Sequence, residues 1–223
     1  PPPRPAARGP RAPRPAPLRG PGGDDVAMSP GSTHHRPILS EAIPATDAAV
    51  DTPALDTRLG EYAVALQWTA LEPGRTADAV FAFNLAQDAE DMQAAAALFE
   101  VPAQNIVFAT ADGHIGYQAP GKIPVRQAVP DAEVPSDGTW PRDGSDERYD
   151  WQGYVPSEEM PRVVDPAEGF IVAANQAVLP DGVAPFLTTD WDDGYRSQRL
   201  RQLLEAEVAA GRTGDGVARA AGP

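Results

Sequence analysis

The sequence predicts an α+β domain, in which helices and strands occupy different stretches of the chain. Three observations predict this class: an Asp-Gly turn between two apolar runs at 105–119, two helix-like stretches before it, and an amphipathic stretch at 194–210. Hydrophobic residues make up 42% of the 223 residues, so the composition allows a sizeable core.

Residues 1–32 are a leader rich in proline and arginine. The first 23 residues hold nine of the 26 prolines, five arginines and no acid. Because proline cannot donate a ladder hydrogen bond or continue a helix, we expect disorder with polyproline-like stretches. The leader is open to three interpretations: a basic tail, a proline-rich ligand, or a translation artefact of GC-rich DNA. We place the domain itself at 33–223.

The net charge of −14 excludes some classes of partner. Five of the 18 basic residues and none of the 32 acidic ones lie in residues 1–23, so the remainder carries −19. This balance disfavours a nucleic-acid binder and an anionic membrane surface. With no cysteine, the chain has no disulfide, zinc-thiolate site or cysteine nucleophile. No run approaches the roughly 18 apolar residues of a membrane span.

The first half of the domain is predicted to hold one strand followed by two helices. Residues 62–70 are mostly apolar, which is typical of a buried strand. Thr76 is in a position to cap a helix over 77–86. Asp88 begins a second helix that reaches residue 99, with an acid three residues after it at a capping-box-like spacing.

The second half begins with the clearest element, the hairpin at 105–119. A long segment at 120–166 is rich in proline, glycine and aspartate, and we expect a loop that wraps a core or lines a site. The apolar run at 169–175 predicts a short buried strand. A helix over 194–210 follows, with Leu200, Leu203, Leu204 and Val208 on one face and Gly211 as its stop.

Several polar residues allow both a structural and a chemical interpretation. Asn175 ends an apolar run, where its amide either ties down the next turn or donates to a developing oxyanion. Arg196 either pairs with nearby aspartates or points a cation into a site. The aspartates at 190, 192 and 193 either favour the helix N-terminus or bind calcium. We expect no metal at His34-His35, because adjacent histidines cannot chelate as an i, i+4 helical pair does.

Seven segments, taken in order and register, resemble the β chain of the penicillin acylase (penicillin amidase) family. The resemblance covers roughly residues 33–210. The segments are ALQWTA (65–70), PAQN (102–105), ADGHIGY (111–117), GKIPVR (121–126), YDWQGYVP (149–156), GFIVAAN (169–175) and DW with GYRSQRL (190–191 and 194–200).

The resemblance implies a partial αββα sandwich of the N-terminal-nucleophile hydrolase type. Such enzymes are made as a precursor that cuts itself into α and β chains, and the new N-terminal Ser is the nucleophile with its own α-amino group as base. The implied substrates are N-acyl amides: penicillins, cephalosporins or acyl-homoserine lactones. Family members are usually exported, which implies a periplasmic or secreted protein.

Four residues take on implied roles by their positions in these segments. Asn175 matches the family's oxyanion-hole Asn, and Arg196 matches the Arg that organises the site. Ile115 lies near a position that lines the acyl pocket. Pro141 matches a backbone carbonyl ligand of the family's Ca²⁺ site, whose other ligands we expect mostly upstream.

The resemblance starts abruptly at Thr33, and the Ser-Asn start of the family's β chain is not seen. Ser29 stands in the leader without family context, and Arg36 replaces an expected Gly. We therefore expect an internal fragment whose partners are the α chain and the rest of the β chain. The alternative is a non-catalytic remnant or interaction module that has kept the scaffold.

Overall fold

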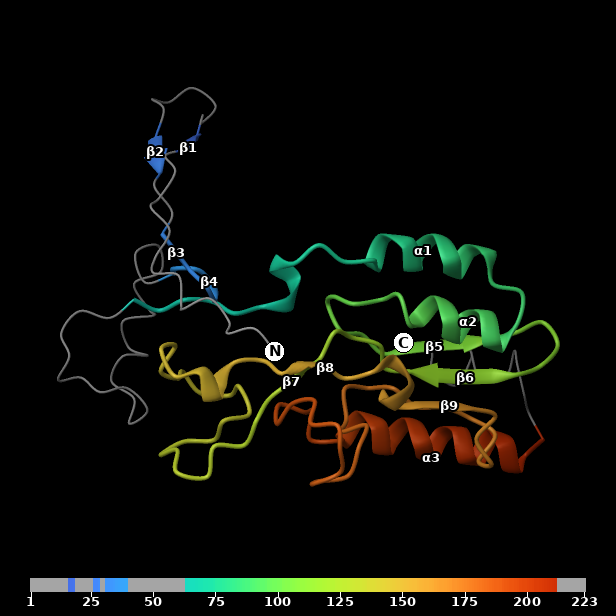
Figure 1. Ribbon diagram of the computed structural model, residues 1–223. Coiled ribbons are helices and arrows are strands. Elements are labelled where there is room, and N and C mark those ends of the chain that lie inside the picture. The colour runs from blue at the N-terminus through green and yellow to red at the C-terminus, as the bar shows by residue number, and fades with distance from the viewer. Residues whose placement is uncertain (1–15, 19–25, 29–30, 40–62, 212–223) are drawn as a thin grey trace. The chain divides into compact units, whose positions relative to one another are not determined.

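The computed structural model describes residues 16–18, 26–28, 31–39 and 63–211, and it divides the chain into two compact units. The first unit takes the chain up to Glu72 and again from Val125 to Gly153, and the second holds the remainder. The chain leaves the first unit after Glu72, returns after Pro124 and leaves again after Gly153. The last two crossings fall within two short paired strands, β7 (Pro124–Val125) and β8 (Gly153–Tyr154) (Figure 1).

The first unit contains two short antiparallel strand pairs. Strand β1 (Ala16–Leu18) pairs with β2 (Val26–Met28), and β3 (Ser32–Thr33) pairs with β4 (Arg36–Pro37). The expectation of disorder does not hold for the six residues of β1 and β2, and most of the remaining leader lies outside the described residues. A ladder is made by main-chain groups and needs no apolar side-chain pattern, which is why the composition did not reveal it.

The strand predicted at 62–70 is wrong. Its described part forms a single bridge between Ala65 and Ile38, supported by the hydrogen bonds from Leu39 N–H to Val64 O (2.8 Å) and from Leu66 N–H to Pro37 O (2.9 Å). The chain then turns into a 3-10 helix at Thr69–Leu71. Because the chain turns this early, the segment is too short to form a ladder. Trp68 is 52% exposed, so this part of the segment is not buried as predicted.

In the second unit, helix α1 (Thr76–Leu85) is followed by α2 (Ala89–Ala96). Capping of α2 by Asp88 is confirmed, since its carboxylate accepts the N–H of Asp91 at 2.8 Å. The Asp91 carboxylate in turn accepts the N–H of Gln87 at 2.9 Å. These two bonds satisfy donors that a helix start leaves without partners.

The cap predicted at Thr76 is wrong, because Thr76 is the first residue of α1 and the N-cap is Arg75. The Thr76 hydroxyl instead accepts the N–H groups of Glu100 and Val101, each at 3.1 Å, and donates to Val101 O. Its side chain therefore fixes the start of α1 to the segment that follows α2.

A three-stranded antiparallel sheet is the centre of this unit. Strand β6 (Ile115–Gln118) lies between β5 (Ile106–Ala109) and β9 (Arg162–Val164). The predicted hairpin is confirmed, with Val107 opposite Tyr117 in the register. The stretch at 120–166 was predicted as a loop, but it contributes β7, β8 and β9. Short strands in a proline-rich stretch carry no visible alternation, so pattern alone did not find them.

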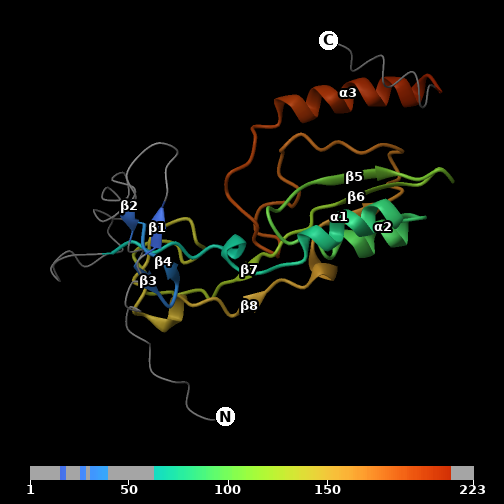
Figure 2. The ribbon, with the colours of Figure 1, turned by 90° about the horizontal axis from the view of Figure 1, so that it is seen from above.

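Helix α2 packs on β5 and β6. Helices α1 and α2 lie on one side of the sheet, and α3 (Tyr195–Ala209) lies on the other in both views (Figures 1 and 2). Helices and strands thus occupy different stretches of the chain, and the α+β prediction is confirmed.

Alanines provide the close packing between the sheet and the first helix layer. Ala79 of α1 and Ala95 and Ala96 of α2 are at most 2% exposed. Tyr117 of β6 is also buried, and its hydroxyl donates to Asn105 Oδ1 at 2.6 Å. Burial raises the pKa of Tyr117 to about 12. A small side chain at each helix contact allows close approach to the strands.

Two predictions for the C-terminal part differ from the structure. Residues 169–175 form no strand, because no described strand lies in register to pair with them. Helix α3 is confirmed, and Gly211 follows it with a φ of 66°, as expected for a helix stop. However, none of the residues of α3 is buried among the described part of the chain, so the predicted apolar face is not covered there.

Within the described residues, no helix is both long enough and apolar enough to cross a membrane.

Substitution of Gly116 tests the register of the central hairpin. Gly116 lies opposite Phe108, and a Cβ atom at 116 would overlap the Phe108 ring. We expect Gly116→Ala to destabilise the fold by about 1–3 kcal/mol, which is the usual cost of overpacking. Urea denaturation followed by circular dichroism measures the loss. Adding Phe108→Ala should recover part of it, whereas simple additivity of the two substitutions would exclude ring overlap as the cause.

Candidate functional site

Asn175 and Arg196 lie in direct contact. A guanidinium N–H of Arg196 donates to Asn175 Oδ1 at 2.7 Å, although the two residues are 21 positions apart. Arg196 belongs to the first turn of α3, and Asn175 follows the irregular segment after β9. The structure thus brings together the two principal residues expected to form the site.

A third residue, Asp192, completes this group. Its backbone N–H donates to the carbonyl of Asn175 at 2.9 Å, and its carboxylate accepts from Arg196 at 3.0 Å. The hydrogen bond from Arg196 holds the pKa of Asp192 below its usual range, with a further contribution from the N–H of Gly194. Arg196 therefore serves both interpretations offered by the sequence: it pairs with an aspartate and it contacts Asn175.

This contact fixes which way the Asn175 amide faces. A guanidinium has only donors, so the carbonyl oxygen of the amide must face Arg196. The NH₂ group of Asn175 points away from Arg196, and it has no hydrogen-bond partner among the described residues. The backbone at Asn175 has a φ of 65°, a left-handed conformation that asparagine tolerates better than most residues.

Gln176 is a site residue that the sequence analysis did not identify. Its side-chain oxygen accepts the N–H of Ala174 at 2.7 Å, and its NH₂ donates to Val172 O at 2.7 Å. These bonds replace the missing ladder and hold the backbone directly before Asn175. The sequence offered one signal for this role, which is that Gln176 directly follows the amide residue Asn175.

The calcium interpretations find little support among the described side chains. The carboxylate of Asp192 is engaged by Arg196, and Asp190, Asp192 and Asp193 do not gather into a group of three metal-binding side chains. No such group forms around Pro141 within residues 31–39 and 63–211 either. Calcium at Pro141 stays a prediction, and it needs ligands from outside these ranges.

Ile115, expected near the acyl pocket, begins β6 and is fixed by Asp165. Its N–H donates to Asp165 Oδ1 at 3.0 Å, and Asp165 Oδ2 lies 2.6 Å from His114 Nδ1. Asp112 lies 3.7 Å from the other ring nitrogen of His114. The role of Ile115 towards substrate stays a prediction.

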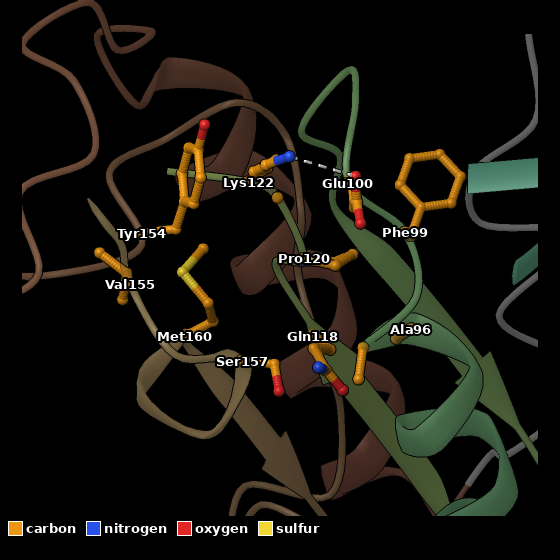
Figure 3. A pocket seen from close by; sticks show the side chains of 12 residues that line it. Ala96, Phe99, Glu100, Gln118, Pro120, Lys122, Tyr154, Val155, Ser157 and Met160 are labelled. Atoms are coloured by element: carbon orange, nitrogen blue, oxygen red, sulfur yellow. Dashed lines mark ion pairs between the residues drawn. The ribbon is translucent and has the colours of Figure 1, made fainter. Parts of the chain in front are cut away.

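A hollow of about 220 Å³ lies elsewhere in the same unit, between α2, β6 and the segment after β8. Figure 3 shows Lys122 and Glu100 facing one another at its rim, with Nζ and Oε2 3.8 Å apart. Lys122 also lies 4.6 Å from the centre of the Tyr154 ring. The buried Gln118 lines the hollow. Asn175 and Arg196 are not among its lining residues, so the candidate site is separate from it.

Comparison with known proteins gives a consistent result. The family described as penicillin amidase matches residues 17–220. The acyl-homoserine lactone acylase QuiP of Pseudomonas fluorescens strain Pf-5 is 34% identical over 174 residues, covering 78% of this chain and 19% of the relative. The penicillin acylase 2 proenzyme of Pseudomonas sp. strain SE83 is 35% identical over 106 residues, which cover 47% of this chain and 13% of the relative.

A solved structure shares the fold. The thermostable penicillin G acylase from Alcaligenes faecalis superposes with a TM-score of 0.51 at 21% identity, over 79% of this chain and 28% of that chain. At this identity the likeness shows the fold alone. The match to the QuiP acylase covers most of this chain but only about a fifth of the relative's length.

The cluster around His114 predicts a measurable pH dependence. The pKa of His114 is raised, first by its hydrogen bond with Asp165 and then by the charges of Asp165 and Asp112. The stability linked to a raised pKa is fully present below the unfolded pKa of histidine and is lost as pH rises through the folded pKa. The pKa of Asp165 is lowered, so its contribution disappears only when acid protonates the folded carboxyl.

We expect Asp165→Asn to lower the pKa of His114 and to reduce the loss of stability that sets in as the pH rises above the unfolded pKa of histidine. Asparagine accepts the φ of 48° at this position, so the backbone is retained. NMR titration of the imidazole protons, assigned with a His114→Ala variant, measures the pKa. An unchanged pKa in Asp165→Asn would show that the contact does not form in solution.

Proposed function

The chain belongs to the penicillin amidase family, and we propose that it supplies the oxyanion-binding part of an enzyme that hydrolyses linear amide bonds. The observation that carries the proposal is the contact between Asn175 and Arg196. It fixes the direction of the amide donors, which have no partner in the described part of the chain. Donors fixed before reaction are the arrangement that stabilises a developing negative charge.

In the proposed reaction, a serine hydroxyl attacks the amide carbonyl of the substrate. The serine is the N-terminal residue of a processed β chain outside the present sequence, and its α-amino group takes the hydroxyl proton. The carbonyl oxygen becomes an oxyanion, and the Asn175 NH₂ donates to it. Collapse of the tetrahedral intermediate releases the amine with that proton, and water then hydrolyses the acyl-enzyme to the free acid.

Arg196 is proposed to act as a positioning residue. It binds the oxygen of the Asn175 amide, and its charge is balanced by Asp192 at 3.0 Å. Gln176 holds the preceding backbone from the other side. Loss of either support would let the amide rotate and would cost catalysis without removing the donor itself.

We propose N-acyl amides as the substrate class, with Ile115 lining the acyl pocket. Support comes from relatives that are named for penicillin and for acyl-homoserine lactones. The proposed partners are the α chain and the rest of the β chain of one precursor, consistent with a relative named as a proenzyme. We further propose a periplasmic or secreted location for the enzyme.

A non-catalytic remnant is the competing proposal. It is favoured by the exposure of Asn175 and Arg196 in the described chain, because an oxyanion site works best where water is excluded. The two proposals differ in what the segment does once it is joined to the rest of an acylase.

The purified 223-residue chain is expected to show no amidase activity, since the proposed nucleophile lies outside it. Incubation with a chromogenic phenylacetyl amide and with an N-acyl-homoserine lactone measures turnover, and a penicillin G acylase provides the positive control. Turnover by the chain above that of a heat-denatured sample would contradict the assignment of the nucleophile.

In the complete acylase that contains this segment, we expect Asn175→Ala to reduce kcat by about 10²–10³-fold with little change in KM. This corresponds to the roughly 3–4 kcal/mol that one oxyanion donor contributes. Steady-state kinetics on processed enzyme, with cleavage verified by gel electrophoresis, measures the effect. Arg199→Ala is the matched control, because Arg199 lies on the same helix and its described partner is Gln202. Equal kcat values for Asn175→Ala and the control would favour the non-catalytic remnant.

A further inference from the structure

The turn between β3 and β4 places two histidines side by side. His34 and His35 occupy the two turn positions of this hairpin, between Thr33 and Arg36. Their ring centres are 3.7 Å apart with a tilt of 44°. Two adjacent residues in extended chain point to opposite faces, whereas this turn brings both imidazoles to the same side.

Asp150 joins the two histidines from a distant part of the same unit. It is the C-cap of the 3-10 helix at Glu147–Tyr149 and lies 115 positions after His35. Its Oδ1 is 2.8 Å from His35 Nε2. One potential ligand atom from each of the three residues lies within 4.8 Å of the other two.

We propose that His34, His35 and Asp150 bind a divalent transition metal ion of the Zn²⁺ type. Two imidazole nitrogens and one carboxylate oxygen are a donor set suited to such ions. With bonds of about 2.0–2.2 Å, tetrahedral geometry separates ligand atoms by roughly 3.3–3.5 Å. The three ligand atoms lie within 4.8 Å of one another, so side-chain rotations can bring them to this separation. The fourth position is left to water.

The side chains around the cluster hold two of its members in place. The nearest cation in sequence, Arg36, is paired with Glu72 at 3.0 Å. The His35 side chain is only 15% exposed and that of Asp150 31%, so both are already ordered. Gly144 lies against the ring of His35, where a Cβ atom would be 3.2 Å from Nδ1. The ring is therefore held with Nε2 towards Asp150.

Metal binding would replace the hydrogen bond between His35 and Asp150 by two coordinate bonds, with Nε2 of His35 as a lone-pair donor and the ring proton on Nδ1. It would join the hairpin at 31–39 to the segment at 125–153, both parts of the first unit. The inference does not depend on the proposed amidase activity, since none of the three residues takes part in it.

Zinc binding to the full chain, purified without a histidine tag, tests the proposal directly. Equilibrium dialysis against ZnCl₂ is expected to give one ion per chain, and Co²⁺ absorption reports the coordination. His34→Ala, His35→Ala and Asp150→Asn should each weaken binding at least tenfold. His114→Ala is the matched control, because the chain has three histidines and no cysteine, and it should bind as the parent does.

A second measurement separates a metal site from a purely structural ion pair. Saturating zinc should raise the Tm of the parent chain and of His114→Ala but not that of His34→Ala. His34 is exposed, so its replacement leaves the fold intact. Should His35→Ala fail to fold, His34→Ala and Asp150→Asn decide the outcome. Absence of binding at 100 µM zinc, or undiminished binding in His34→Ala, overturns the proposal.

Discussion

The second unit depends on one strand that is hydrogen-bonded along both edges. Strand β6 pairs with β5 on one side and with β9 on the other. Its four residues are thereby fixed in position and direction, and most of the unit's features derive from them. Tyr117 and Gln118 form the buried layer beneath α2, Gly116 provides space for the ring of Phe108, and Ile115 binds the Asp165 carboxylate at the sheet end.

The candidate site lies outside this ladder and is held in a different way. Asn175 is fixed by its neighbour Gln176, by the backbone of Asp192 and by the guanidinium of Arg196. The bonds from Gln176 and Asp192 engage main-chain groups that a strand would have paired in a ladder, and the bond from Arg196 fixes the side chain. A donor that is placed by side chains depends on each of them, so the chemistry of this site is more sensitive to substitution than its backbone is.

Local signals in the sequence were enough for elements that make their own contacts. The Asp-Gly turn predicted the hairpin, and Asp88 predicted the start of α2, because in both cases the determining bonds lie within a few residues. Elements that depend on distant partners could not be found in this way. Strand β9 exists because β6 offers an edge, and the run before Asn175 is not a strand because no described strand lies in register beside it.

The same distinction applies to the sites. The roles of Asn175 and Arg196 came from a family resemblance, and their contact at 2.7 Å is consistent with those roles. The adjacent positions of His34 and His35 argued against a metal site. A local pattern could not include Asp150, which lies 115 positions after His35. Gln176 has a function only through the backbone conformation it stabilises, which no composition reveals.

Arg196 occupies an electrostatically unfavourable position in its own helix. The first turn of α3 contains this cation and no acid, although a helix N-terminus carries a partial positive charge. Asp192, just before the helix, offsets part of this repulsion. Selection for thermal stability alone would therefore replace Arg196 by an acid. If variants selected for activity keep the arginine, helix stability has been given up for control of the Asn175 amide.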